Sequence, residues 1–509
     1  MKKYALYTVI GLVLAAALII FVLPGGIGFL VKDRYLTMLN TVNKSGNLEL
    51  RITKYHRGWF NSEATLEVKP SGSALIHLQD WSEGSNAKPI TFLIDQTIQH
   101  GPILKLITAE GKTRWLFGQA LLKSQTQPSI GAINSITLIR IGGSLLSAVT
   151  APVIHYSNPE KHMLLIMKGL AMSLNLSADF NHINTRFNIP QLDLKTADFQ
   201  QSISGFAAQY NLQKSPSGLM WGEKITAIND ITWKTTKDNS QANIAGLYVD
   251  MRSSEARNKV TYAINATLNN LSIADQQYGP QQLDLVLNKL DLTTVLALTS
   301  ALKKLRQVNS MPPEQLQTYS NLFAQLIRNG MEINIRKLSL NTHWGAPQLT
   351  AQLIWSPQPT DEPNQGLNLT QLNADAHLTL PARFLTQALN YTYQYLVKNK
   401  LLTPNPQNLS KLNSNPDYIA QEIISWWAQN RWITAQDGSY SLDVGYKKQA
   451  ITVNGQALQG RSVFPSTIQQ SSDSTTAANS KSGKSGSGGS DPKNPDVHTA
   501  GKVPKSGKK

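Results

Sequence analysis

The chain has 509 residues, of which 41% are hydrophobic and 16% are charged, and this composition excludes a protein that is disordered over most of its length. It contains no cysteine, which excludes structural disulfides, thiolate zinc sites and cysteine nucleophiles. The net charge is +16, but the Lys and Arg residues are not clustered with stacking aromatic residues, so nucleic acid is not an expected partner.

The N-terminal segment predicts a membrane anchor. Residues 5–23 form an almost unbroken apolar run, close to the length of about 20 residues that a transmembrane helix needs. Lys2 and Lys3 precede the run, which favours an N-terminus in the cytoplasm. A cleaved signal peptide is the alternative, but the run is long for one and no small-x-small cleavage site ends it. We therefore expect residues 1–34 to form a cytoplasmic N-terminus and a transmembrane signal anchor.

Residues 35–464 predict a β-rich body. Apolar and polar residues alternate with a period of two, which is the pattern of strands with one buried face. The clearest alternating runs are 48–52, 64–68, 170–176, 183–189, 225–233, 262–271, 331–340, 349–355, 372–380 and 440–446. Strands and helices do not alternate through the middle of the chain, so we predict an antiparallel sheet instead of a doubly wound fold.

Helical periodicity interrupts this pattern in four places. Residues 291–330 predict a helical hairpin, with Asp291 as the N-cap of its first helix and Gly330 at the end of its second. Two further amphipathic helices are predicted at about 382–400 and 416–431. Alternating runs lead directly into or out of three of these helices, so we expect the helices to cover a face or an end of the sheet.

The C-terminal segment, residues 465–509, is rich in Ser, Gly and Lys and has few apolar residues, which predicts a disordered tail. Such a tail suits solubility, and its Lys residues alternatively suit a tether to anionic envelope material. The predicted fold is therefore mainly β (α+β). It consists of an N-terminal transmembrane helix, a large antiparallel-sheet periplasmic body with four inserted amphipathic helices, and the tail.

Two short motifs carry the densest unusual residues. The first is Tyr55-His56-Arg57-Gly58-Trp59-Phe60-Asn61-Ser62, and the second is His100-Gly101-Pro102 at the end of another strand. The first motif suits an anion site or a general base. It equally suits a strand-turn-strand segment whose aromatic side chains pack beneath the sheet, with Gly58 supplying an unusual backbone angle. No nucleophile or carboxylate accompanies either motif at a recognisable spacing, so we assign no catalytic residue, metal ligand or cofactor.

These motifs, following an N-terminal anchor, resemble the YdgA-type family of Gram-negative bacteria. Members of that family are inner-membrane-anchored periplasmic proteins with a domain of unknown function. The resemblance extends to about residue 460. It implies an inner-membrane location, a periplasmic body and a homodimer, and it implies no established reaction.

We therefore expect a non-enzymatic, single-pass inner-membrane protein that binds lipid or other envelope components. A long sheet with an apolar inner face shelters acyl chains if helices do not fill it. Two alternatives stay open. One is a periplasmic hydrolase centred on residues 55–62, in which His56 and Arg57 converge in a pocket with a distant carboxylate. The other is a homodimeric scaffold or assembly factor. The expected partners are inner-membrane lipids, a second copy of the chain, and an envelope protein or lipid ligand.

Overall fold

The computed structural model describes residues 23–43, 48–71, 91–107, 111–126, 131–159, 162–238, 240–274, 276–305, 313–357, 369–399, 401, 417–458 and 465. Within these ranges, no helix combines the length and the apolar character needed to cross a bilayer. The predicted anchor lies outside the described residues except at its end, and the predicted tail lies outside them except for Pro465.

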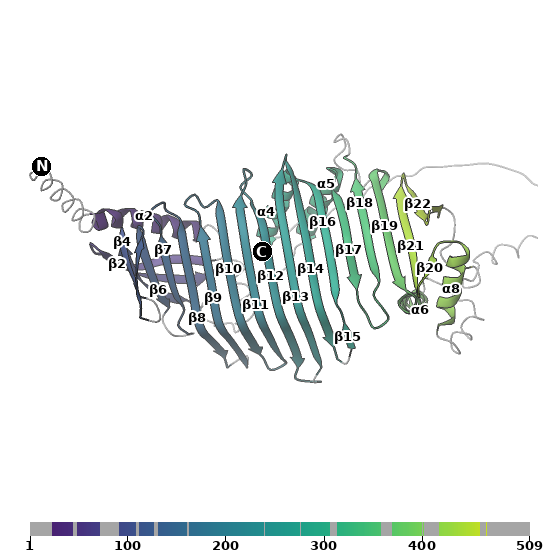
Figure 1. Cartoon of the computed structure of the whole chain (residues 1–509), viewed down its shortest axis with the longest axis horizontal. Coiled ribbons are helices and arrows are strands. Elements are labelled where there is room, and N and C mark those ends of the chain that lie inside the picture. Colours follow the sequence, from purple (N-terminus) through teal and green to yellow (C-terminus); the bar gives the residue numbers. More distant parts are fainter. Residues whose placement is uncertain are drawn as a thin grey trace, which may run out of the picture.

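The body is one long antiparallel sheet of 21 strands (Figure 1). Its strands are β1 (Leu48–Arg57), β2 (Asn61–Pro70), β3 (Phe92–His100), β6 (Ala120–Thr126), β7 (Asn134–Ile139), β8 (Leu145–Asn158), β9 (Met163–Leu176), β10 (His182–Lys195), β11 (Phe199–Lys214), β12 (Met220–Thr235), β13 (Gln241–Ala256), β14 (Lys259–Ile273), β15 (Gln276–Tyr278), β16 (Gln281–Asp291), β17 (Glu332–Leu340), β18 (Gln348–Trp355), β19 (Leu372–Pro381), β20 (Thr434–Gln436), β21 (Ser439–Lys447), β22 (Ala450–Val453) and β23 (Gln456–Ala457). The remaining strands, β4 (Ile103–Ile107) and β5 (Thr113–Phe117), pair only with each other. The prediction of a large antiparallel sheet is confirmed.

The strands follow one another through the sheet in chain order. Each main strand pairs with the next, so that β3 pairs with β6, β14 with β16 and β19 with β21. The short strands β15 and β20 pair with the ends of β14 and β21. Neighbours in the sheet are therefore neighbours in the chain, as expected for a meander built from hairpins.

The predicted helices are present. The helical hairpin consists of α4 (Leu292–Leu305) and α5 (Pro313–Arg328), and the two later helices are α6 (Ala382–Lys398) and α8 (Tyr418–Gln429). A short 3-10 helix, Leu369–Gln371, precedes β19. The Asp291 carboxylate accepts a hydrogen bond of 3.0 Å from the backbone N–H of Thr294, which confirms the predicted N-cap. Strand β16 leads directly into α4 and β19 into α6, as the alternating pattern predicted.

Besides the four predicted inserted helices, the described chain has a fifth α-helix, α2 (Leu23–Asn43). It crosses the predicted boundary at residue 34 and packs on the first strands of the sheet (Figure 1). Its sequence lacks a clear amphipathic stripe, since Phe29 and Leu30 are exposed while Val31 and Tyr35 are buried. For this reason the segment looked like a continuation of the anchor.

The register of the sheet separates an apolar face from a polar one. One row of directly paired residues runs across the sheet as Val149, Met172, Phe187, Ala208, Thr226, Val249, Ala266, Leu283, Leu338, Leu349, Leu378 and Leu442. The adjacent row, whose side chains point to the other side, reads Thr150, Ala171, Asn188, Ala207, Ala227, Tyr248, Thr267, Gln282, Ser339, Gln348, Thr379 and Ser441. We call the side of the first row the helix face and the side of the second the polar face.

All five helices pack on the helix face, where they bury three separate clusters. Beneath α2, the buried residues include Leu66, Ile98 and Leu122. Beneath α4 and α5, the buried residues come mainly from β14, β16 and the helices themselves. Beneath α6 and α8, they come mainly from the helices, with partly buried residues of β19 and β21 packed against them. The expectation that helices cover the sheet is confirmed, but the described helices leave a gap between the first and second clusters.

Candidate functional site

The two sequence motifs meet beneath the first turns of α2. The strand β1 ends with Tyr55, His56 and Arg57, and β2 begins three residues after Gly58. The backbone N–H of His100, at the end of β3, donates a hydrogen bond of 2.7 Å to the carbonyl oxygen of Phe60. Residues about 40 positions apart therefore form one cluster at the end of the sheet, as the backbone pairing of β2 with β3 requires.

His100 is the centre of this cluster, with only 3% of its surface exposed. Its Nδ1 lies 3.1 Å from the carbonyl oxygen of Trp59, and its Nε2 lies 2.9 Å from the hydroxyl of Ser62. Because a carbonyl only accepts, Nδ1 carries the proton and Nε2 accepts from Ser62. Burial lowers the pKa of His100, the hydrogen bond to Trp59 opposes this, and the nearby Arg57 lowers it further. His100 is therefore a neutral, fully paired side chain.

Two glycines of α2 allow the helix to approach this cluster closely. A Cβ atom added at Gly28 would lie 2.7 Å from the ring of His100, and one added at Gly25 would lie 2.8 Å from the ring of Trp59. Arg57 donates a hydrogen bond of 3.3 Å to the carbonyl oxygen of Gly25 and lies 3.4 Å from the ring centre of Phe29. The first motif and His100 thus hold α2 on the sheet.

The same geometry indicates what the cluster can do chemically. Arg57 points toward α2, whereas His56 is exposed on the other face of β1, so the structure does not bring these two side chains into one pocket. The hydroxyl of Ser62 and the ring of His100 do form a pair, but both are buried and no carboxylate orients the histidine. Within the described residues, no three His, Asp or Glu side chains are arranged to bind a metal ion.

The second candidate site is the gap in the helical cover, which lies over β9–β13. No residue of β10, β11 or β13 belongs to the buried clusters formed by the described residues. Most apolar side chains of the helix face here are half-buried, such as Phe187, Ile203 and Val249. Trp233 is 49% exposed, whereas Ile189 and Ala208 are buried. Aromatic contacts between Phe187 and Phe206 (5.6 Å) and between Phe199 and Trp233 (5.5 Å) order this surface. We call the helix face of β9–β13 the open face.

An irregular row of residues crosses the strands of the open face and keeps this face apolar along their full length. We call this row the crease. Gly169, Gly205 and Gly246 have φ of +74°, +62° and +66° and lie in one row across the sheet, where the regular pairing is interrupted. In each strand the apolar alternation shifts by one residue at this row. In β13, for example, Ala242 and Ile244 precede Gly246, and Leu247 and Val249 follow it. Without the shift, half of each strand would present its apolar residues to the polar face.

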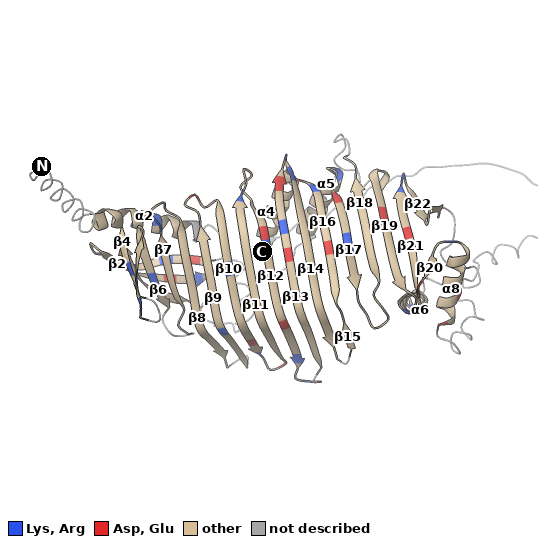
Figure 2. Ribbon diagram, viewed as in Figure 1, with Lys and Arg blue, Asp and Glu red and all other residues tan. Residues whose placement is uncertain are grey.

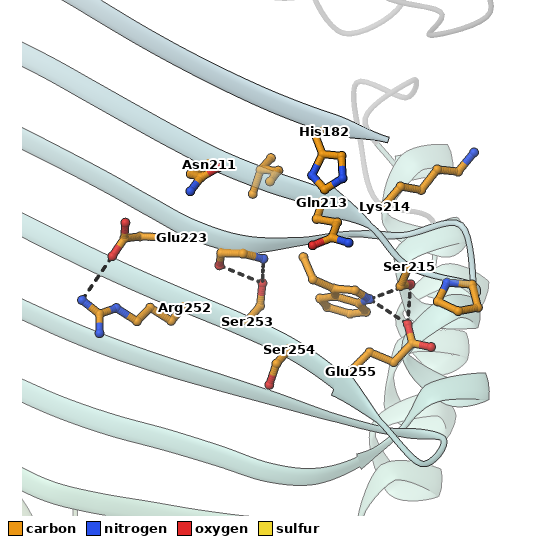
Figure 3. Close-up of a pocket in the computed structure, with 14 residues that line it drawn as sticks. His182, Asn211, Gln213, Lys214, Ser215, Glu223, Arg252, Ser253, Ser254 and Glu255 are labelled. Atoms are coloured by element: carbon orange, nitrogen blue, oxygen red, sulfur yellow. Dashed lines mark hydrogen bonds and ion pairs between the residues drawn. The ribbon is translucent and has the colours of Figure 1, made fainter. Parts of the chain in front are cut away.

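The polar face carries most of the charged residues of the central strands, and Figure 2 shows the charged residues as isolated positions along a mostly uncharged sheet. A hollow of about 880 Å³ lies over the ends of β10–β13 (Figure 3). The acidic groups in the hollow are engaged, because Glu223 pairs with Arg252 at 3.1 Å and Glu255 accepts hydrogen bonds from Ser215, Ser217 and Trp221. The hydrogen bond from Ser215 is the largest cause that lowers the pKa of Glu255, followed by that from Ser217. These contacts fix the β11–β12 turn to the end of β13.

Sequence reasoning found the residues of both motifs but missed Gly25, Gly28 and the crease. The two glycines lie within residues 1–34, which the sequence predicts as the anchor segment. A signal for the crease was present, since the apolar alternation changes phase at Gly169, Gly205 and Gly246. A phase change in one strand resembles ordinary irregularity, and only the register shows that the changes lie in one row.

Comparison with known proteins places the chain in a family but assigns it no activity. No curated protein and no solved structure matches the chain. A family model described as a bacterial protein of unknown function, DUF945, matches residues 1–459, which includes the predicted anchor segment, both motifs, the open face and all five described helices. The chain therefore belongs to the DUF945 family of bacterial proteins.

Proposed function

We propose that this protein is a non-enzymatic envelope protein of the YdgA type that is anchored in the bacterial inner membrane and holds lipid acyl chains on its open face. Its N-terminus lies in the cytoplasm and its body in the periplasm. The observation that carries the proposal is the apolar, helix-free surface of β9–β13 among the described residues.

The size of the open face supports the proposal that an apolar partner binds there. These strands have 14–16 residues each. At about 4.8 Å between strands and about 3.3 Å per residue, five of them present on the order of 1,000 Å² on one face. Most apolar side chains on this face are only partly buried, so covering them would remove further apolar surface from water, which favours a bound apolar partner.

The position of the open face favours acyl chains as that partner. Helix α2 begins where the predicted membrane-spanning run ends, and it packs on the same face of the sheet a few strands away, beside β1, β3 and β6. A lipid that leaves the bilayer beside the anchor therefore meets the apolar side of the sheet first. Lys224 is the one charged residue that the register of β9–β13 places on the central rows of this face, so little opposes the burial of a hydrocarbon chain.

The hydrolase alternative receives less support. A serine nucleophile needs access to substrate and a histidine oriented by a further group. Ser62 and His100 are buried beneath α2, and the histidine is fixed by a backbone carbonyl. In the scaffold alternative, a second copy of the chain covers the open face instead of lipid.

The test compares two neighbouring residues that point to opposite faces of β13. Val249 lies on the open face, and Tyr248 lies on the polar face with 37% exposure. The full-length chain and its Val249→Asn and Tyr248→Asn variants would be extracted from bacterial membranes in a mild detergent and analysed by native mass spectrometry. We expect lipid of defined stoichiometry on the unmodified chain and on Tyr248→Asn, and a loss of lipid from Val249→Asn.

Two outcomes would contradict the proposal. Equal lipid content in all three proteins would place the lipid elsewhere, in the detergent-solubilised anchor. A lipid-free dimer that dissociates in Val249→Asn would identify a second copy as the occupant and would support the scaffold instead. Circular dichroism of each variant checks that the sheet is retained.

A further inference from the structure

The connections at the ends of the strands beside the start of α2 carry an unusual number of exposed apolar side chains. Three connections contribute: the β1–β2 turn, the β4–β5 hairpin and the β7–β8 turn. Their exposed residues are Trp59 (54%), Phe60 (46%), Ile103 (43%), Trp115 (64%), Phe117 (69%) and Ile141 (64%). We call these six residues the aromatic edge.

Backbone hydrogen bonds hold these connections side by side. The N–H of His100 bonds to Phe60, and the N–H of Gly118 bonds to Pro102 at 3.0 Å, which joins the base of the hairpin to the end of β3. The Gln119 side chain donates a hydrogen bond of 2.7 Å to the carbonyl oxygen of Ile141. The three connections that carry the aromatic edge therefore lie together at one end of the sheet.

The β4–β5 hairpin turns one complete face outward. Ile103 pairs with Phe117, and Lys105 pairs with Trp115, and all four residues are exposed. On the other face Leu104 is buried, with 1% exposure. A two-stranded hairpin on its own is marginally stable in water. This hairpin also exposes an apolar outer face to water, which makes it less favourable still. An environment that covers the outer face would stabilise it.

The position of the aromatic edge points to a bilayer as that environment. Trp59 touches Gly25, in the first turn of α2 and directly after the predicted membrane-spanning run. On the outer side of the same helix, Phe29 and Leu30 are 60% and 59% exposed. Trp and other amphipathic or apolar side chains are enriched where proteins meet the membrane–water interface.

The excess of basic residues in this region favours a bilayer that contains anionic lipids. The segments 23–35, 57–61, 100–119 and 139–145 contain the edge and the start of α2. Together they have two acidic residues, Asp33 and Glu110, and seven basic residues: Lys32, Arg34, Arg57, Lys105, Lys112, Arg114 and Arg140. Basic residues next to an apolar surface favour anionic lipid head groups.

We propose that the aromatic edge is a second membrane contact, which docks the body onto an anionic phospholipid surface beside the anchor. Four partly exposed aromatic side chains alone offer on the order of 400 Å² of surface for insertion. The contact would orient the sheet at the bilayer, with α2 and then the open face leading away from it. This inference rests on the proposed inner-membrane anchor, but it does not depend on acyl chains binding to the open face.

The absence of cysteine allows a direct test, because any introduced cysteine is unique. A polarity-sensitive fluorophore would be attached to the full-length chain at Ile103→Cys, at Ile141→Cys or, as a control, at Phe323→Cys on α5, where 51% of the side chain is exposed. Each labelled protein would be placed, one chain per disc, in nanodiscs of phosphatidylcholine with or without phosphatidylglycerol.

We expect the labels at 103 and 141 to shift their emission to shorter wavelengths in the anionic discs and to lose quenching by aqueous iodide. The label at 323 should remain open to iodide. Lys105→Glu, combined with the label at 141, should restore quenching in the anionic discs. Labels at 103 and 141 that stay as open to iodide as the label at 323 would overturn the proposal. Shielding that appears only in discs with two chains would overturn it in favour of a contact between copies.

Discussion

The sheet beneath α2 and the sheet at β9–β13 use the same alternation of apolar and polar residues, yet they have different surfaces. Beneath α2, Ile98 and Leu122 are 0% and 3% exposed. On the open face, Phe187 and Val249 are only half-buried, because the neighbouring strands shield them from the sides and no described helix lies above them. The strand pattern therefore determines which side is apolar, and the cover determines whether that side is a core or a binding surface.

This difference also separates stability from function. Side chains beneath α2 contribute burial free energy to the folded state, at about 25 cal/mol for each Å² of apolar surface removed from water. Apolar side chains on the open face contribute less until something covers them. A polar substitution should therefore act mainly on folding in the first region and mainly on ligand binding in the second.

The largest expected effect comes from placing the same polar side chain in both regions. Leu122→Asn should lower the free energy of unfolding by about 4 kcal/mol, because it removes buried apolar volume and buries an amide without a designed partner. Val249→Asn should cost about 1 kcal/mol or less, since the amide on the open face remains accessible to water. Chemical denaturation of the full-length protein measures both values. Equal losses would mean that the open face is a filled core.

The next effect tests how α2 is held on the sheet. Gly28→Ala should lower the free energy of unfolding by about 2–3 kcal/mol, because the added methyl group meets the ring of His100, which two hydrogen bonds hold in place. Gly26→Ala is the matched control, since nothing lies within 4 Å of its added Cβ. It should be neutral or stabilising by up to about 1 kcal/mol. Thermal and chemical denaturation report the difference, and similar results for both variants would show that α2 is not closely packed.

The crease offers a third comparison, within the open face itself. Gly205→Ala should cost about 1–3 kcal/mol, because φ is +62° and the added Cβ would lie 2.2 Å from the amide nitrogen of Asn229. Combining it with Asn229→Gly removes the collision but not the backbone strain, so the double variant should recover part of the loss. A double variant no more stable than Gly205→Ala would place the whole cost in the backbone conformation.

Much of the fold could be predicted from the sequence, because the sheet is a meander whose strands pair with their chain neighbours. Alternation in runs such as 262–271 and 331–340 identified strands, and the 3.6-residue period identified the hairpin of α4 and α5. Strands such as β11 were less visible, since Gly205 changes the phase of their alternation. Helix α2 was missed because both of its sides carry large apolar residues.

The candidate sites were predictable only in part. The first motif and His100 were recognised as unusual, but their meeting depends on the pairing of β2 with β3, and neither motif shows that Gly25 and Gly28 lie against them. The open face depends on where helices are absent, which is a property of the whole fold. Individual strand sequences cannot reveal it, since an apolar row looks the same whether or not it is covered.

The smallest expected effect concerns pH and returns to the covered region. Burial lowers the pKa of His100 in the folded protein, so below its ordinary value of about 6.5 the unfolded chain binds more protons than the folded one. Stability is therefore fully present above that pH and should fall as the pH decreases below it, until the folded protein also becomes protonated.

His100→Gln should lower stability at neutral pH by about 1 kcal/mol and flatten this dependence. Melting temperatures across the acidic range measure the slope. An unchanged slope in His100→Gln would mean that another group causes the pH dependence and that the neutral histidine beneath α2 does not.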